Sequence, residues 1–503
     1  MRTSVSQRRT FIAVFMLVVA VVAASLAWVV ASPVGASPDE DYHVGSMWCP
    51  PPVDETGCQI STKDGEKAVM VPQSLAKEHV TCYAFDHNNS AQCSLNASDD
   101  VLAPTVRWDD GNYPWGYYQF AHLFVQHSTN RAVLALRAVN TLLAIGLVGG
   151  IIALSDSGLR RAIGVALTAA WLPMGFYFIA GMNPSSWAMT GTFAFAAGLL
   201  AATRSAGARR VGLIACAVAG AVLACTSRGD SAFFLFVVTV ALAFAVPASK
   251  RIVPEAILAC VASVVGIWVM ARTNVAASHL GSGNELAEYS LKHIAWLNVS
   301  SLPNYLRGFV GHLLGPGWND VSYQGTVSYG ASVVVVAVAL WSLRSLTWRK
   351  ALSAVTVAGA IMGVPVVIGM RGHFNNVLVY QPRYMLPLLA VFFLLWFVVA
   401  DGPPFASRPQ IALLLGLSAA VHSLALHIVI QRYTRGMDDQ SFSMLSNLNS
   451  IVRWWWNVPV SPMTVWQVAS TTYLIAVVTA VALTRPRDGA RTRSECADDA
   501  VAP

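Results

Sequence analysis

The fold of this 503-residue chain is decided by the stretch Thr10–Ala31, TFIAVFMLVVAVVAASLAWVVA, which contains no charged residue. A helix needs about 20 apolar residues to cross the ~30 Å hydrocarbon core of a bilayer. Arg8 and Arg9 precede the stretch, and positively charged flanks tend to stay in the cytoplasm. The stretch therefore predicts a membrane-spanning helix with a cytoplasmic N-terminus.

A small-residue sequence, Val34-Gly35-Ala36, follows this helix and resembles a signal-peptidase site. The apolar core of a cleaved signal peptide is about 7–15 residues long, shorter than the stretch found here. We therefore favour a retained membrane anchor over a cleaved signal peptide.

The composition extends this interpretation to the whole chain. Hydrophobic residues make up 55% and charged residues 12%, whereas soluble domains carry about 25% charged residues. So few charged residues cannot provide the polar surface of several water-soluble domains. The composition also excludes a disordered or fibrous protein and a nucleic-acid binder. The net charge of +7 is explained by basic residues in cytoplasmic loops. The sequence predicts an all-α, polytopic integral membrane protein.

About twelve apolar windows are candidates for membrane spans. They are Thr10–Ala31, Val133–Leu154, Ile163–Ala180, Trp187–Thr203, Val211–Thr226, Ser231–Val246, Glu255–Ala271, Ala331–Leu343, Ala351–Met370, Tyr384–Ala400, Ile411–Ile430 and Gln467–Leu483. Basic residues cluster in alternate loops, as at Arg209–Arg210 and Arg349–Lys350. This pattern predicts a multi-pass protein of the cell inner (plasma) membrane with both termini in the cytoplasm.

The chain is thereby divided into six predicted segments. They are the N-terminus with the first helix (1–32), a large extracytoplasmic loop (33–131), helices two to seven (132–271), a second extracytoplasmic loop (272–330), helices eight to twelve with a Trp-rich outer loop (331–484), and a cytoplasmic tail (485–503).

Four of the eight cysteines, Cys49, Cys58, Cys82 and Cys93, lie in the first outer loop. Cysteines that face an oxidising compartment form disulfides, and four of them allow three pairings. Pairing of neighbours, Cys49–Cys58 and Cys82–Cys93, closes the short rings and is the expected arrangement. The alternative is a metal site, although no CxxC spacing is present.

Acidic residues are concentrated just outside the first span, in Ser37-Pro38-Asp39-Glu40-Asp41. Three adjacent carboxylates raise the pKa of at least one of them unless a cation or a hydrogen-bond donor compensates. The cluster could take a proton from a hydroxyl group or hold a divalent cation. The alternative is a solvated turn after the helix. The metal is unknown, and a divalent cation is the only candidate cofactor.

A second acidic pair, Asp109 and Asp110, precedes an aromatic segment that is predicted to lie at the membrane interface. Two arginines at the outer ends of spans, Arg228 and Arg383, are candidates for binding a phosphate, because a guanidinium forms two-pronged contacts with oxyanions. The alternative for both is ordinary extension of the side chain toward the membrane surface.

Three short motifs resemble an uncharacterised family of bacterial polytopic membrane proteins with a domain of unknown function. They are P-D-E-x-x-H (Pro38, Asp39, Glu40, His43), Y-P-x-x-Y-Y (Tyr113, Pro114, Tyr117, Tyr118) and Q-x-R-Y-x-x-P (Gln381, Arg383, Tyr384, Pro387). Their order along the chain matches from the first span to the tenth.

That family is similar in layout to the GT-C glycosyltransferases, which include the protein O-mannosyltransferases and the aminoarabinose transferases. The resemblance implies a GT-C-like fold and a catalytic carboxylate in the first outer loop, here Asp39 with Glu40 adjacent. We expect substrate contacts from the motif residues and nearby polar groups. These are His43, Asp109, Asp110, Tyr117, Arg228, Gln381, Arg383 and Tyr384.

The resemblance implies transfer of a sugar from a polyprenyl-phosphate donor in the membrane lipid to an envelope glycan, lipid or protein. Two alternatives remain open at this point. One is a transporter or flippase of a lipid-linked or polar solute, although no acidic residue lies in the middle of a predicted span, where coupled transporters usually place one. The other is a non-catalytic protein of envelope assembly.

Overall fold

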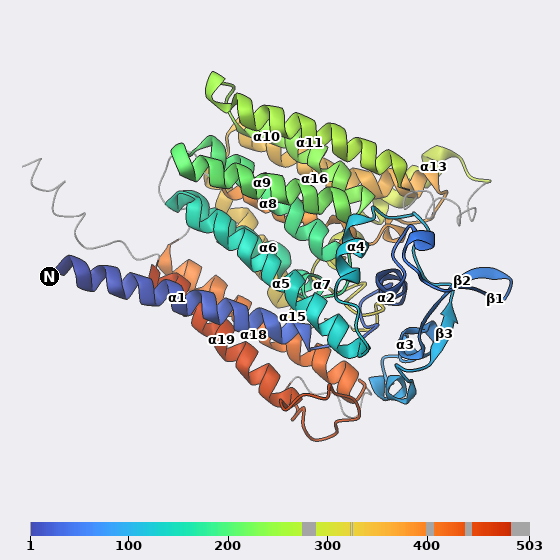
Figure 1. Cartoon of the computed structure of the whole chain (residues 1–503). Helices are drawn as coiled ribbons and strands as arrows, with labels where there is room; N and C mark the ends of the chain where they lie inside the picture. Colours follow the sequence, from blue (N-terminus) through green and yellow to red (C-terminus); the bar gives the residue numbers. More distant parts are fainter. Residues whose placement is uncertain are drawn as a thin grey trace, which may run out of the picture.

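A computed structural model describes residues 2–273, 288–321, 323, 325–398, 407–437 and 445–483. Long helices lie side by side as a bundle, and the segment between α1 (Arg2–Val29) and α5 (Thr129–Leu154) forms a cap at one end (Figure 1). We call this end the loop end. The predicted tail 485–503, with Cys496, lies outside the described residues.

Every predicted window overlaps helix in the described residues, which confirms a polytopic all-α membrane protein; the end of the window Tyr384–Ala400 lies outside the described residues. The remaining helices of the bundle are α6 (Ser157–Trp171), α7 (Met174–Ile179), α8 (Ser185–Thr203), α9 (Gly207–Ser227), α10 (Gly229–Ala245), α11 (Val253–Arg272), α15 (Thr326–Trp341), α16 (Trp348–Arg371), α17 (Leu386–Phe397), α18 (Arg408–Thr434) and α19 (Pro462–Leu483). In the described residues, seven helices are long and apolar enough to cross a membrane, and three apolar ones are shorter. The window Ile163–Ala180 is divided between α6 and α7 at Pro173, which lacks the backbone N–H needed to continue the helical hydrogen bonds.

Helix α8 forms the centre of the bundle. Almost every residue in it is buried, and it lies against α9 along a line of small residues. A Cβ atom added at Gly191 would lie 2.6 Å from the carbonyl oxygen of Gly220 on α9. Small residues allow two helix backbones to approach closely in a membrane, where dispersion contacts replace the hydrophobic effect.

The cap at the loop end contains a small sheet that the sequence did not predict. Strands β1 (Ile60–Lys63), β2 (Glu66–Pro72) and β3 (Leu102–Thr105) form an antiparallel sheet in the order β1-β2-β3, with Val69 opposite both Ile60 and Thr105. Short helices α2 (Glu40–Trp48), α3 (Lys77–Val80) and α4 (Gly116–His122) complete the cap.

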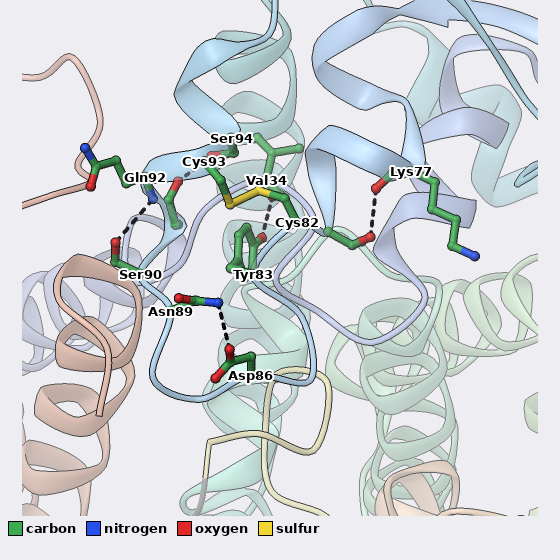
Figure 2. Close-up of a disulfide and its surroundings, with 12 residues drawn as sticks. Val34, Lys77, Cys82, Tyr83, Asp86, Asn89, Ser90, Gln92, Cys93 and Ser94 are labelled. Atoms are coloured by element: carbon green, nitrogen blue, oxygen red, sulfur yellow. Dashed lines mark hydrogen bonds between the residues drawn. A yellow bond between two sulfur atoms is a disulfide. The ribbon is translucent and has the colours of Figure 1, made fainter. Parts of the chain in front are cut away.

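Both expected disulfides are present. Cys49 is bonded to Cys58 and Cys82 to Cys93, which confirms the pairing of neighbours. The first bond fixes the end of α2, since Cys49 is its C-terminal cap residue. Figure 2 shows the second bond beside Tyr83, whose hydroxyl donates a 2.8 Å hydrogen bond to the carbonyl of Val34.

The four loop cysteines are expected to resist alkylation in membranes until they are reduced. A membrane-impermeant maleimide, followed by mass spectrometry of the loop peptides, measures this directly. Closing a ring of about 15 residues stabilises a protein by about 3 kcal/mol in the chain-entropy model, so reduction should loosen the cap and leave the helices folded. Free thiols at all four positions without reductant would contradict the assignment.

One buried arginine attaches the cap to the bundle. Arg432, in the last turn of α18, has no exposed surface and pairs with Asp320 at 2.7 Å. The same guanidinium donates to the carbonyls of Tyr83 (2.8 Å) and Asp86 (3.0 Å), and also to that of Asn89. The loop that contains these carbonyls follows Cys82 (Figure 2). Arg432 therefore connects α18 to two segments that are distant in the sequence.

Candidate functional site

The turn between α1 and α2 is anchored by a buried ion pair. Arg137, on α5, donates to the carbonyls of Val29 (3.2 Å), Ser32 (2.8 Å) and Pro33 (2.8 Å), which lie at the C-terminal end of α1 and just beyond it. It also pairs with Glu40 at 2.7 Å, and both side chains are almost wholly buried. The start of α2 is thus fixed against α5.

Glu40 is fully engaged in this anchor. Its second carboxylate oxygen accepts the backbone N–H of Ser37 at 2.7 Å. Burial raises the pKa of Glu40, while the charge of Arg137 opposes that effect. The structure therefore separates Glu40 from its neighbour Asp39, which occupies the N-cap position of α2 with φ 59°. Asp is among the few residue types other than glycine that adopt this left-handed conformation, which recurs in turns and at functional sites.

Asp39 is the accessible carboxylate of the cluster. Its side chain is 43% exposed, against 2% for that of Asp41. One oxygen of Asp39 lies 3.3 Å from Nη2 of Arg107, and the other lies 3.0 Å from Nη2 of Arg383. Burial alone would raise the pKa of Asp39, but the charges of Arg383 and Arg107 outweigh it and lower the pKa below its ordinary value. Asp39 is therefore ionised at neutral pH.

Arg107 is a member of the site that the sequence analysis missed. It holds Asp41 with two hydrogen bonds, of 2.8 Å from Nε and 3.2 Å from Nη2, in addition to its contact with Asp39. It lies just after β3 and just before Asp109. The sequence offered one signal for this residue, because Arg107 is close to the acidic pair Asp109 and Asp110. Nothing in the sequence indicated that its partners would be Asp39 and Asp41.

One donor nitrogen of Arg383 has no hydrogen-bond partner among the described residues. The side chain is 7% exposed, and its Nη2 is shared between Asp39 and the hydroxyl of Tyr384, each at 3.0 Å. Its Nη1 is buried and has no hydrogen-bond partner among the described residues. A buried donor left unsatisfied costs about 1–3 kcal/mol, more for a charged group. An anion placed there would satisfy it.

Arg228 completes the positively charged side of the site. Its guanidinium lies over the ring of Tyr384, 4.5 Å from the centroid, and 5.7 Å from that of Tyr113. It is already paired with Asp230 through two 2.9 Å hydrogen bonds. Arg228 is therefore held in place by Asp230, and both Arg228 and Arg383 lie over the ring of Tyr384.

His43 connects the first motif with the second. Its Nδ1 lies 2.8 Å from the hydroxyl of Tyr118, and its ring meets that of Tyr113 edge-on at 5.6 Å. Burial lowers the pKa of His43 to about 3, so the imidazole is neutral at physiological pH. Arg383, from the third motif, reaches Asp39 across 344 positions. Three short motifs that are far apart in the chain therefore meet at one place at the loop end.

Asp109 lies next to this place and contacts α2 directly. It accepts a 2.7 Å hydrogen bond from the hydroxyl of Tyr42 and the backbone N–H groups of Asn112 and Tyr113. Burial raises the pKa of Asp109 to about 6 despite these donors. Its bonds hold the Tyr113 segment against α2, so its contacts are those of a supporting residue.

The other three predicted substrate contacts have partners other than Asp39 and Arg383. The side chain of Asp110 is 68% exposed and lies 4.0 Å from Nζ of Lys67. The hydroxyl of Tyr117 accepts a bond from Asn140 at 3.3 Å in the bundle core, and the carbonyl of Gln381 accepts one from Tyr305 at 3.5 Å. Within the described residues, no group of three His, Cys, Asp or Glu side chains is arranged to hold a metal ion.

Comparison with known proteins identifies the family. The family model described as predicted membrane protein (DUF2142) matches residues 6–392. The chain belongs to the DUF2142 family. The match contains all three motifs that converge at Asp39. No curated protein and no solved structure matches the chain.

The ion pairs of Asp39 in this DUF2142 protein predict a pH-dependent stability. Because the folded pKa is lowered, the pairs contribute fully above the ordinary value of 3.8, and this contribution is lost as the pH falls through the lower folded pKa. The difference in melting temperature between the native protein and Asp39→Asn is therefore expected to be constant near neutrality and to shrink below about pH 4. A difference that grows on acidification would contradict the lowered pKa.

Proposed function

We propose that this DUF2142 protein is a GT-C-like glycosyltransferase that moves a sugar from a polyprenyl-phosphate donor to a cell-envelope acceptor. The observation that carries the proposal is the convergence of the accessible Asp39 with Arg383, whose buried Nη1 lacks a partner among the described residues. Transfer of a sugar from a phosphate uses a carboxylate that takes the proton of the acceptor hydroxyl and a cationic group that stabilises the departing phosphate.

The loop end is proposed to face the extracytoplasmic side of the membrane. The two disulfides of the cap support this orientation, because disulfides persist in oxidising compartments and are rare in the cytoplasm. A polyprenyl chain would then lie in the outer leaflet, with its phosphate at the depth of the helix ends that carry Arg228 and Arg383.

Binding of the donor phosphate would change the partners of Arg383. A phosphate oxygen at Nη1, and a second at Nη2, would form the two-pronged contact that guanidinium groups make with phosphates. This contact competes with the bond from Nη2 to Asp39. As the phosphate takes up the charge of Arg383, the pKa of Asp39 rises, and the carboxylate becomes a stronger base only when a donor is present.

The transfer step then uses Asp39 as general base. The oxygen of an acceptor hydroxyl forms a bond to the anomeric carbon of the sugar as the bond from that carbon to the phosphate oxygen breaks. The hydroxyl proton passes to Asp39, and the electron pair of the broken bond stays on the phosphate, where Arg383 stabilises it. Proton transfer by a positioned base contributes about 10²–10⁴-fold to such a rate.

Donor binding is expected to depend on Arg383 more than on any arginine outside the site. Undecaprenyl phosphate, titrated into the purified protein in nanodiscs and read by native mass spectrometry, should bind Arg383→Ala at least about tenfold more weakly, since a charge-assisted contact is lost. Arg383→Lys should recover only part of the affinity, because an ammonium group cannot form the two-pronged contact.

The matched control for this test is Arg371→Ala, because Arg371 is an exposed arginine at the end of α16. It should bind the lipid as the native protein does. Equal affinity in Arg383→Ala and the native protein would contradict the proposed phosphate site.

A further inference from the structure

A cavity lies in the cap, apart from the arginine cluster. It has a volume of about 250 Å³, and its lining residues come from the turn after α1, the segments around Ser74, Val80 and Ser94–Asp99, the start of α5, and the Trp-rich segment. Val34, Asn130 and Trp454 are among its lining residues. None of the residues that line it belongs to the site around Asp39.

The walls of this cavity carry hydroxyl, amide and carboxylate groups. One oxygen of Asp99 accepts from the hydroxyls of Ser74 (2.5 Å) and Thr129 (2.8 Å), while the other, among the residues that the structure describes, accepts only the backbone N–H of Thr129 at 3.0 Å. The second oxygen can therefore accept a further bond. Ser94 and Asn130 add groups that both donate and accept.

An aromatic residue lines the same cavity as these polar groups. Trp454 lines the cavity and is itself 4% exposed. Hydroxyl groups that need both donors and acceptors, together with a face of C–H bonds that packs against an aromatic ring, are the features of a sugar. A volume of about 250 Å³ is below the ~300–1,000 Å³ of pockets for drug-sized ligands, and it suits a single sugar ring.

The cavity is held open by covalent and close-packed structure. Val34 and Ser94, two of its lining residues, lie beside the Cys82–Cys93 disulfide (Figure 2). Gly35, with φ +84°, lies so close to Val80 that an added Cβ would be 2.2 Å from its carbonyl oxygen. A rigid cavity avoids the cost of ordering its own side chains when a ligand binds.

We infer that this cavity binds one sugar residue of the acceptor, which makes the acceptor a carbohydrate; the inference rests on the proposed function. Val34 in the cavity wall is five residues before Asp39, so their Cα atoms lie at most about 18 Å apart. An acceptor of a few sugar units can therefore occupy the cavity with one unit and present a hydroxyl of another to Asp39.

The test measures sugar binding without any transfer reaction. Methyl glycosides of glucose, galactose, mannose and arabinose are added to the full-length protein in nanodiscs, and saturation-transfer difference NMR detects those that bind. At least one is expected to give a signal. Ala97→Phe, which fills the cavity from its wall, should abolish that signal, and Asp99→Asn should weaken the binding about tenfold or more through loss of a charge-assisted bond.

Two neighbouring residues provide matched controls. Asn96→Phe places the same ring on the exposed side of the same segment, and Asp100→Asn removes a carboxylate whose side chain is 75% exposed. Both should bind as the native protein does. If none of the glycosides binds, or if Ala97→Phe binds them as well as Asn96→Phe does, the inference is overturned.

The undecaprenyl phosphate titration separates this inference from the proposed function. If lipid binding depends on Arg383 but no glycoside gives a signal, only the inference that the cavity binds the acceptor is overturned. A glycoside signal that Ala97→Phe abolishes, with no dependence of lipid binding on Arg383, would retain a sugar site and remove the glycosyltransferase proposal.

Discussion

Replacing Arg432 by alanine is expected to lower the free energy of unfolding by about 3–5 kcal/mol, as is typical when one partner of a buried ion pair is removed. The carboxylate of Asp320, only 4% exposed, would be left buried without its cation. The carbonyls of the Tyr83–Asn89 loop would lose their donor at the same time. Thermal unfolding in nanodiscs, followed by circular dichroism, measures the loss, and limited proteolysis should cut the cap first.

Arg453→Ala is the matched control for this prediction. Arg453 lies in the segment between α18 and α19, and its side chain is exposed. Surface substitutions of this kind usually change stability by no more than about 0.5 kcal/mol. A melting temperature of Arg432→Ala equal to that of Arg453→Ala would show that Arg432 does not hold the cap on the bundle.

Asp39→Asn is expected to reduce sugar transfer by about 10²-fold or more while donor binding is retained. The amide preserves the shape of the side chain and can still contact Arg107, but it cannot take the proton of an acceptor hydroxyl. Turnover measured with a radiolabelled polyprenyl-phosphate sugar, beside the binding assay for undecaprenyl phosphate, separates the two effects.

Three neighbouring acids are the internal controls for Asp39. Asp110→Asn should transfer sugar at the native rate, because the side chain is exposed and its nearest cation is Lys67 at 4.0 Å. Asp41→Asn should give a milder loss through Arg107. Glu40→Gln should lower stability through the Arg137 anchor more than it lowers turnover per folded molecule. Equal losses in all four variants, with activity that follows an added divalent ion, would replace the general base with a metal site.

The sequence predicted the helical part of the fold because a bilayer demands long apolar windows. Each window overlaps helix in the residues that the structure describes, and the neighbour pairing of the cysteines followed from ring size. The sheet β1-β2-β3 was missed, since its strands are four to seven residues long and β1 is mostly polar. The division of one window into α6 and α7 could have been predicted from Pro173, which interrupts it.

The motifs of the candidate site could be predicted from the sequence, but the pairs that its residues form could not. Asp39 and Arg383 were named from separate motifs, and only the folded chain brings them to 3.0 Å. Glu40 and Asp39 are adjacent and chemically similar, so no pattern could tell that one is buried against Arg137 and the other left accessible. Arg107 and Arg137 escaped notice because their partners lie 66 and 97 positions away.

The central claim is tested most directly by the lipid-linked sugars of cells in which Asp39→Asn is the only copy of the protein. Mass spectrometry of the extracted polyprenyl phosphates compares these cells with cells that carry Asp110→Asn. The account predicts that one polyprenyl-phosphate sugar accumulates in the Asp39→Asn cells alone, together with loss of that sugar from the envelope. An unchanged lipid-linked sugar pool and unchanged envelope glycans would contradict the glycosyltransferase proposal for this protein.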